Sequence, residues 1–397
     1  MTKLPLLLAL GAASLCTFTQ AQTVTVYGKL YPYMEQESGS GASAVGTPVS
    51  TLSATPTGIN GAPRVTGMSA GNSYLGFRGS EDMGGGLKAI FQLEGVVLVD
   101  NGAAAGLGFG RNTFVGLEGN FGTVKLGHMD TVFKEYGDTL GILGISSGTP
   151  VSSSNILRKA AFGTSNASRF HERRSNSVRY DSPEVGGWQA GLQWATQENK
   201  TTTLGPSTTT SIGVKYDQGP FYASLAYEVH NNFFGGSANA PAAQRNNAVG
   251  GSITSKDAAI QAAVEWRFTK GHKVELDVIN KSYKEPALVA GRFQSYKNTA
   301  WMVAYEGRFD VWRVMAHYVG SAAGSCTRVA AVCNTTGLEG KQLTAGAGYY
   351  LSRRTFLYAV YSNISNGAGA RFAAADFGTP APGEDIRHLM AGISHNF

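Results

Sequence analysis

The 397-residue chain offers few groupings of residues that could form a catalytic centre. One stretch, GISSG at residues 144–148, matches the G-x-S-x-G pattern, which needs a strand before the serine and a helix after it. Here the stretch lies among glycine, serine and threonine and is followed by TPVSSSN, which predicts neither element. H-E-x-x-H, P-loop and metal-type Cys/His patterns are all absent from the sequence. We therefore expect a protein that is not an enzyme and uses no cofactor or metal.

Two of the three cysteines, Cys326 and Cys333, lie seven positions apart in SCTRVAAVCNTT. The third, Cys16, lies in residues 1–21, where one lysine, an apolar run and TQA form the pattern of a cleaved secretory signal. The apolar run is short for a membrane-spanning helix, so we expect the mature chain to begin at Gln22. Outside the cytoplasm, two cysteines predict one disulfide loop. A metal site is the alternative, but no histidine or acidic residue lies between them.

The charge balance is mildly basic, with 33 Lys and Arg against 27 Asp and Glu. The most basic short stretch is HERRSNSVR, residues 171–179. It lacks the interleaved aromatic residues on which the bases of a nucleic-acid strand would stack. We therefore expect no nucleic-acid partner.

Period-two alternation of apolar and polar residues is the main structural pattern. In SYLGFRGSEDMGGGLKAIFQLE, residues 73–94, two alternating runs flank a glycine-rich break, which predicts a β-hairpin. We identify sixteen such runs, and seven tight connections alternate strictly with longer polar ones. An up-and-down antiparallel barrel places all tight turns at one rim, whereas the loops of a soluble sandwich vary at both ends. The runs are residues 23–35, 70–80, 86–97, 110–119, 122–129, 175–182, 187–198, 209–218, 220–230, 256–268, 272–283, 296–308, 311–322, 341–351, 354–364 and 385–397.

The aromatic residues indicate which face of these strands meets lipid. Seven lie within about three residues of a tight turn, and we place them on the apolar face, as expected of an interfacial girdle. The opposite face is rich in charged residues, which stay solvated if sixteen strands enclose a water-filled lumen. We therefore predict an all-β transmembrane barrel over residues 22–397. The seven aromatics are Phe121, Trp188, Phe221, Phe268, Phe309, Trp312 and Phe356.

Several ordered motifs resemble the trimeric general porins of Gram-negative bacteria, with the betaproteobacterial type the most similar. They are VTVYGKLY, SYLGFRGSEDMGGGLKAIFQLE, GRNTFVGLEGNFGTVKLGH, SNSVRYDSPEVGGW and the closing AGISHNF. The resemblance spans the mature chain except its outer loops. It implies a homotrimer in outer-membrane lipid, and a terminal Phe397 recognised by the barrel assembly machinery.

The resemblance also implies a pore constriction. In this family a long third outer loop folds into the pore and opposes its acidic residues to basic residues on the wall. The matching loop runs from about residue 129 to 174. Two positions depart from the family's pattern and would lower the fixed positive charge: Tyr74 and His128 stand where arginine is usual. The constriction residues so implied are Lys29, Tyr74, Arg78, His128, Asp130, Glu135, Asp138 and Arg179.

The expected function is passive diffusion of small hydrophilic solutes and ions across the outer membrane, with a weak preference for anions. Two other classes remain as alternatives. One is a surface adhesin or structural barrel with a closed lumen, which single-channel recording would distinguish from a porin. The other is an outer-membrane lipase or protease barrel, although such enzymes typically use fewer strands.

Overall fold

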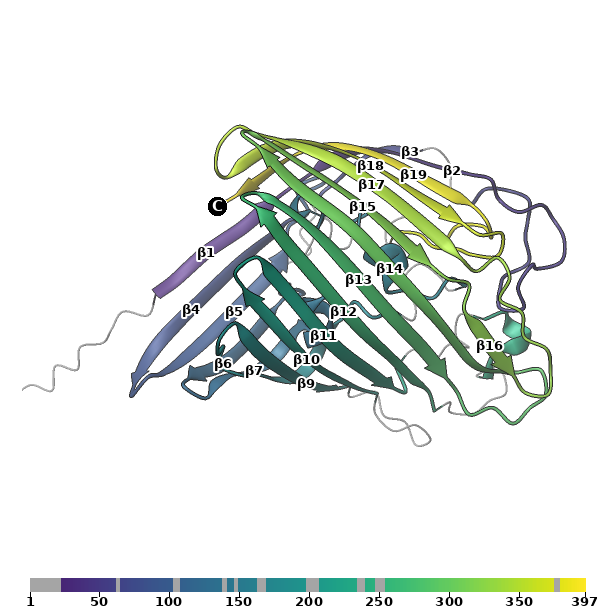
Figure 1. Ribbon diagram of the computed structural model, residues 1–397, viewed down its shortest axis with the longest axis horizontal. Helices are drawn as coiled ribbons and strands as arrows, with labels where there is room; N and C mark the ends of the chain where they lie inside the picture. Colours follow the sequence, from purple (N-terminus) through teal and green to yellow (C-terminus); the bar gives the residue numbers. More distant parts are fainter. Residues whose placement is uncertain are drawn as a thin grey trace, which may run out of the picture.

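The computed structural model describes residues 23–61, 65–102, 108–137, 141–145, 149–162, 169–197, 207–233, 240–246, 254–374 and 379–397. Nearly all regular structure in these ranges is antiparallel β-sheet, which curls into a tilted barrel (Figure 1). The expected signal, residues 1–21, lies outside the described ranges. None of the described helices has the length and apolar character needed to cross a membrane.

The described chain contains nineteen strands and four short helices. In chain order they are β1 (Thr23–Leu30), β2 (Tyr33–Ser40), β3 (Val65–Ser69), β4 (Tyr74–Gly84), β5 (Leu87–Val96), β6 (Thr113–Gly119), β7 (Gly122–Asp130), α1 (Val132–Tyr136), η1 (Ile142–Gly144), α2 (Ser154–Leu157), β8 (Arg173–Asp181), β9 (Trp188–Thr196), β10 (Thr208–Gln218), β11 (Phe221–Asn231), η3 (Ala242–Gln244), β12 (Lys256–Thr269), β13 (His272–Lys284), β14 (Phe293–Phe309), β15 (Trp312–Ser321), β16 (Ser325–Arg328), β17 (Gly340–Tyr350), β18 (Thr355–Asn366) and β19 (Asp385–Asn396).

These strands form a closed barrel of sixteen staves, as predicted. A stave is here one complete crossing of the barrel wall, and it can contain two of the strands named above. The first stave is β1 with β2, interrupted at Tyr31 and at Pro32, which has no backbone N–H to donate to a neighbouring strand. The second stave is β3 with β4, and β16 lies in an outer loop, where it pairs with β14. Closure joins the first stave to β19, mainly through eight residue pairs between β2 and β19.

All tight turns lie at one end of the barrel and all long loops at the other (Figure 1). The turn end also holds the C-terminus (Figure 1) and Thr23, the first described residue, which pairs with Ser80 near the turn between β4 and β5. Gly84, at the turn between β4 and β5, has a φ of +82°, and Asp310, between β14 and β15, has a φ of +53°. Such positive φ angles suit glycine and tolerate aspartate, which explains the composition of these turns.

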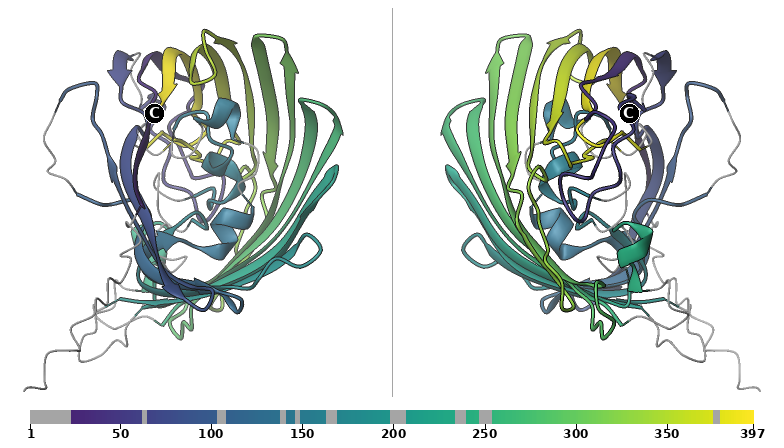
Figure 2. Two further views of the ribbon diagram at one scale, coloured as in Figure 1. Left: turned by 90° about the vertical axis from the view of Figure 1, so that its left-hand side faces the viewer. Right: turned by 90° about the vertical axis from the view of Figure 1, so that its right-hand side faces the viewer.

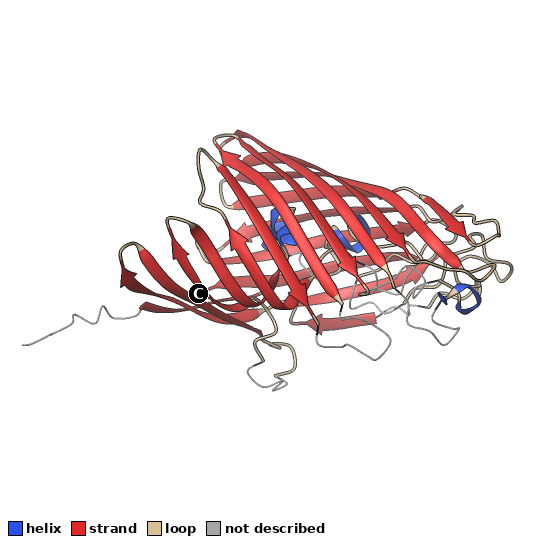
Figure 3. Cartoon of the chain, turned by 90° about the horizontal axis from the view of Figure 1, so that it is seen from below, coloured by secondary structure: helices blue, strands red, loops and turns tan. Residues whose placement is uncertain are grey.

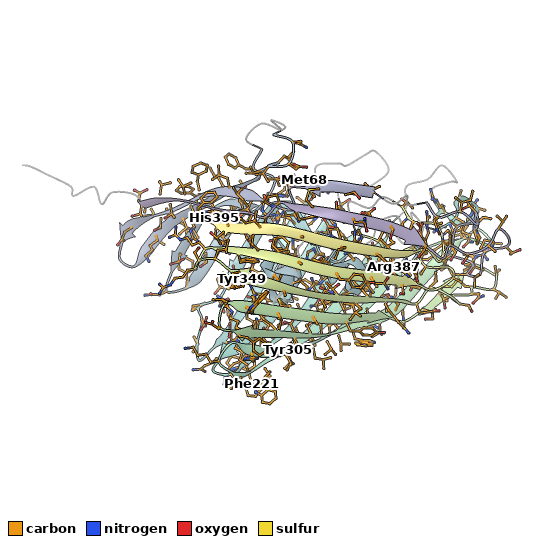
Figure 4. The ribbon with its side chains drawn as sticks, turned by 90° about the horizontal axis from the view of Figure 1, so that it is seen from above. Met68, Phe221, Tyr305, Tyr349, Arg387 and His395 are labelled. Carbon is orange, nitrogen blue, oxygen red and sulfur yellow. A yellow bond between two sulfur atoms is a disulfide. The ribbon has the colours of Figure 1, made fainter. Side chains whose placement is uncertain are left out.

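The outward face of the barrel is apolar. Six of the seven girdle aromatics are exposed, and Figure 4 labels Phe221 among the side chains of this outer surface. The assignment of Phe356 to that face was wrong, because it is 3% exposed and packs against Tyr350 and Tyr358. In β18 it is Leu357 that faces outward. The outward face predicted for this strand was therefore wrong by one residue.

The long connection between β7 and β8 folds into the barrel, and its helices α1 and α2 are visible inside the wall (Figures 2 and 3). We call this connection, residues 131–172, the inner loop. Its apolar side chains are almost completely buried against the wall and other loops. They include Phe133, Ile142, Leu157 and Phe162. The lumen is therefore less uniformly polar than the sequence suggested, since an apolar cluster occupies part of it.

Three outer loops are joined to one another. The predicted disulfide is present between Cys326 and Cys333 in the loop after β15. Asn334, beside it, receives a hydrogen bond from Thr51 Oγ1 at 2.9 Å and donates its own N–H back to that oxygen at 2.8 Å. Gln244, in the loop after β11, donates to the Thr51 carbonyl. Segments nearly 300 residues apart in the chain therefore form one connected outer surface.

Candidate functional site

Helix α1 of the inner loop rests directly on the wall. Thr131 caps it by accepting a hydrogen bond from Lys134 N at 3.2 Å, which satisfies one free donor at the helix start. Opposite the helix, the wall carries Gly191 on β9 and Gly213 on β10. A Cβ atom at Gly191 would lie 2.9 Å from the Tyr136 hydroxyl oxygen and 3.0 Å from the Val132 methyls. The two glycines therefore allow an approach that a larger residue would prevent.

Backbone groups of the inner loop bond to polar side chains of the wall. Phe133 N donates to Ser211 Oγ at 2.8 Å, and the Tyr136 carbonyl accepts from the Tyr222 hydroxyl at 2.5 Å and from Ser224 Oγ at 3.0 Å. Further along the loop, Lys281 Nζ donates to the Leu157 carbonyl at 2.7 Å. These contacts give buried backbone groups the partners they require and hold the loop in one path.

Arg158 of the inner loop is almost fully buried and links the loop to itself and to the wall. Its Nε donates to Gln261 Oε1 at 3.1 Å, and its Nη2 donates to the Gly137 carbonyl. Gln261 Nε2 donates to the same carbonyl at 3.1 Å. Burial also raises the pKa of the Tyr136 phenol nearby, so that side chain stays neutral.

Two acids implied as constriction residues, Asp130 and Glu135, contact cations. Glu135 Oε2 is 2.5 Å from Arg179 Nη1, and the same guanidinium binds Asp181 through Nη2 at 2.8 Å. Asp130 Oδ1 is 2.7 Å from Lys134 Nζ and 3.1 Å from Arg173.

The third acid expected in this group, Asp138, lies outside the described residues.

Lys29 meets the inner loop at a different point. Its Nζ donates to the Gly144 carbonyl at 2.5 Å and lies 5.3 Å from the centre of the Tyr31 ring. A Cβ atom built on Gly144 would lie 3.1 Å from Lys29 Nζ and 4.0 Å from Arg313 Nη1. Lys29 and Arg313 therefore place two cations beside the same turn of the loop.

Arg78 and Tyr74 belong to a separate cluster on the wall. The Arg78 guanidinium lies 4.9 Å from the Tyr27 ring centre, and that of Arg111 lies 4.6 Å from the Tyr74 ring centre. Tyr27 and Tyr74 meet edge to face at 6.2 Å. Glu94 accepts from the Tyr27 hydroxyl at 3.1 Å and is ion-paired with Arg111. The rings of Tyr27 and Tyr74 thus lie between the two arginines.

His128 lies within electrostatic reach of Asp130 and Arg173, and Phe397 lies at the closure of the barrel beside Gly28. His128 Nδ1 is 2.8 Å from Ser175 Oγ, and the residue has the strand phase of the outward-facing Leu126. The structure does not bring it against Lys29 or Arg78. Phe397 exchanges backbone hydrogen bonds with Gly28, each of 3.2 Å, and so helps to close the barrel at its turn end.

Sequence reasoning did not assign three further cations to the constriction: Arg111, Arg173 and Arg313. Arg313 has the lumen-facing phase of its strand, and this signal could have identified it. Arg111 precedes β6, and its partner Glu94 lies on the preceding strand β5, so the pairing depends on the path of a loop that alternation does not specify.

The described residues contain one grouping with the ligand types of a metal site. Glu35 and Glu37 on β2 and His388 on β19 each bring a ligand atom within 4.8 Å of the others. Two carboxylates and an imidazole could bind a divalent transition metal. Of the GISSG stretch only Gly144 and Ile145 are described, and they end a short 3₁₀ turn that follows no strand directly.

Comparisons with known proteins agree with this geometry. The family model described as Gram-negative porin matches residues 7–397. Outer membrane porin protein 32 of Delftia acidovorans is 30% identical over 336 residues, which cover 83% of this chain and 85% of that protein. Major outer membrane protein P.IB of Neisseria lactamica is 33% identical over 39% of this chain and 41% of its own length.

Solved structures share the fold. The anion-selective porin from Comamonas acidovorans superimposes with a TM-score of 0.67 at 24% identity, covering 95% of this chain and all of that one. A trimer form of OmpT from Vibrio cholerae gives 0.60 at 13% identity, over 95% of this chain and all of that chain.

Proposed function

The chain belongs to the Gram-negative porin family, and from this we propose that it is a general diffusion channel of the outer membrane, through which small hydrophilic solutes and ions pass down their gradients. The observation that carries the proposal is the inner loop, which crosses the lumen and is fixed to the wall by charged side chains. A loop so placed narrows the passage without closing the barrel at its ends. Passage then depends on solute size and on the charges beside the loop.

The proposed constriction consists of the charged residues at the loop and the wall beside it. Arg179 and Asp130 take part in ion pairs, which reduces their net field. Lys29 and Arg78 make no ion pair with a described residue, so they supply the remaining positive charge. A pore filled with water and salt screens such charges over about 8–10 Å at physiological ionic strength. We therefore expect a weak preference for anions.

Tyr74 and His128 have smaller proposed roles. Tyr74 contributes an uncharged ring at the wall, where it lies beneath Arg111. His128 sits at the outer part of β7 beside Ser175 and would add charge to the mouth only when protonated. The third acid, Asp138, is proposed as a further member on sequence grounds alone.

The oligomeric state and the insertion of the chain into the membrane are proposed from the family and from the structural neighbours. One structural neighbour is described as a trimer form, and we infer that this chain also forms a homotrimer in outer-membrane lipid. Phe397, as the end of the last strand, is proposed as the residue that the barrel assembly machinery recognises. Cleavage of residues 1–21 is proposed to precede this step.

The chain is a channel rather than an enzyme, and we propose that it has no catalytic activity. The test is reconstitution of the mature protein in planar bilayers, with single-channel currents and the reversal potential measured in a salt gradient. We expect stepwise, ohmic conductance and a reversal potential on the anion side. Failure to conduct would instead favour a structural or adhesive barrel, and a strong cation preference would contradict the proposed constriction.

A further inference from the structure

Four lumen-facing side chains form one row across four adjacent strands on the turn side of Lys29. Thr25 of β1 pairs with Arg78 of β4, Arg78 pairs with Gln92 of β5, and Gln92 pairs with Phe114 of β6. Neighbouring strands lie about 4.8 Å apart, so the positions of Arg78 and Phe114 are separated by roughly 10 Å. The Arg78 guanidinium and the Phe114 ring therefore lie on either side of the Gln92 amide.

Arg78 is the accessible charge of this row. Its side chain is exposed, and it makes no ion pair with any residue in the described ranges. The neighbouring arginine, Arg111, differs because Glu94 neutralises it. Stacking of Arg78 on the Tyr27 ring orients the guanidinium without occupying all of its N–H groups. The remaining N–H groups can therefore donate two hydrogen bonds to one carboxylate.

A groove of about 330 Å³ follows the same row, at the small end of the range for ligand sites. Arg78, Thr25 and Gln92 give it hydrogen-bonding groups, while Ile90 and Phe114 give it apolar surface. Lys125, which lies 5.3 Å from the Phe114 ring centre, is itself paired with Asp181 at 2.8 Å. Beside Phe114 the groove therefore offers ring contact with little free positive charge.

We propose that this row is a weak binding subsite for small carboxylates that carry one planar aromatic ring. The carboxylate binds Arg78, Thr25 or Gln92 donates to it, and the ring packs on Phe114 and Ile90. Both Arg78 and the groove are open to solvent, so binding is weak enough for the solute to leave again, as passage requires. The subsite deepens the proposed channel function and depends on it.

The test compares benzoate with cyclohexanecarboxylate, which has the same charge and a similar size but no aromatic ring. Each is added at increasing concentration to the full mature protein in a planar bilayer in potassium chloride, and the fall in chloride current is measured. We expect benzoate to halve the blockable current at about three- to tenfold lower concentration, the factor that one ring contact provides. Equal half-blocking concentrations would contradict the subsite.

Substitutions at two positions, Arg78 and Phe114, separate the contributions of charge and ring. Arg78→Gln should weaken block by both carboxylates, whereas Phe114→Leu should remove the preference for benzoate and Phe114→Tyr should restore it. Arg308→Gln, which removes an exposed lumen-facing charge near the turn after β14, is the matched control and should keep the preference. A preference unchanged in Phe114→Leu would overturn the proposal. A wild type that forms no channel contradicts the proposed function itself, whereas a conducting wild type without discrimination contradicts the subsite alone.

Discussion

Arg179 of β8 and Glu135 of α1 form an ion pair in which the buried partner belongs to the wall and the half-exposed partner to the inner loop. The Arg179 side chain is 2% exposed, and that of Glu135 is 49% exposed. The same guanidinium also binds Asp181 and donates to the Asp130 carbonyl at 3.3 Å. One side chain therefore fixes the start of the inner loop at several points.

Replacing Arg179 with glutamine should loosen the loop and change selectivity together. Glu135 and Asp181 lose their shared cation, so we expect the attachment of the loop to weaken by about 1–3 kcal/mol and the reversal potential to move toward cations. Open-channel noise and reversal potential in planar bilayers measure the two effects. Lys88→Gln, which removes an exposed charge paired only at 3.8 Å, is the control. An unchanged reversal potential in Arg179→Gln would show that this pair does not contribute to the pore field.

Gly191→Val should displace α1. The valine side chain would occupy the space now filled by Tyr136 and Val132, and relief of that overlap costs about 1–3 kcal/mol. We expect a folded barrel with altered unit conductance, because the inner loop moves while the strands remain paired. Gly67→Val is the matched control, since a Cβ atom there meets no atom within 4 Å. Identical conductance in the two variants would argue against close packing of α1 on Gly191.

Removal of the disulfide should affect stability only modestly. Cys326 and Cys333 close a short ring, for which the chain-entropy model gives at most about 2–3 kcal/mol. We expect Cys326→Ser with Cys333→Ser to form the barrel but to be cut faster by protease in the loop after β15. Labelling of the denatured, unreduced wild type should detect no free thiol in the mature chain. Two labelled thiols per chain would show that the bond does not form in the cell.

Topology can be tested by tagging the two ends of the barrel. Epitopes inserted at Asn101 and at Leu288, which is 95% exposed in the loop between β13 and β14, should bind antibody on intact cells. An epitope at Asp310 lies in a tight turn and should bind only after the outer membrane is permeabilised. The reverse pattern of labelling would place the long loops in the periplasm and reject the proposed orientation.

Strand number, connection pattern and outward face could all be predicted from the sequence, because alternation with period two repeats in every stave. Errors arose where alternation is locally ambiguous. In FLYAVY of β18 both faces are apolar, so the phase of Phe356 could not be read from hydropathy. The breaks near Pro32 and in the second stave, and the added strand β16, depend on pairing partners rather than on composition.

The site was less accessible to prediction than the fold. The sequence names the acids near the inner loop, but their partners depend on the path of the loop across the lumen. That path is set by contacts such as those of Gly191 and Lys281, which are remote in sequence from the loop they hold. Local patterns carry no information about such long-range contacts, and so Arg111 and Arg173 were not assigned to the constriction, whereas the lumen-facing phase of Arg313 on β15 could have identified it.

The bonds among Thr51, Asn334 and Gln244 determine how the outer surface would be recognised by an antibody or a phage. Any footprint centred on these residues includes parts of three loops whose order along the chain is lost on unfolding. Peptides copied from a single loop would lack the neighbours that fix its shape, and antisera raised against them should react poorly with intact cells. Epitope mapping of this protein therefore requires the folded barrel rather than a peptide array.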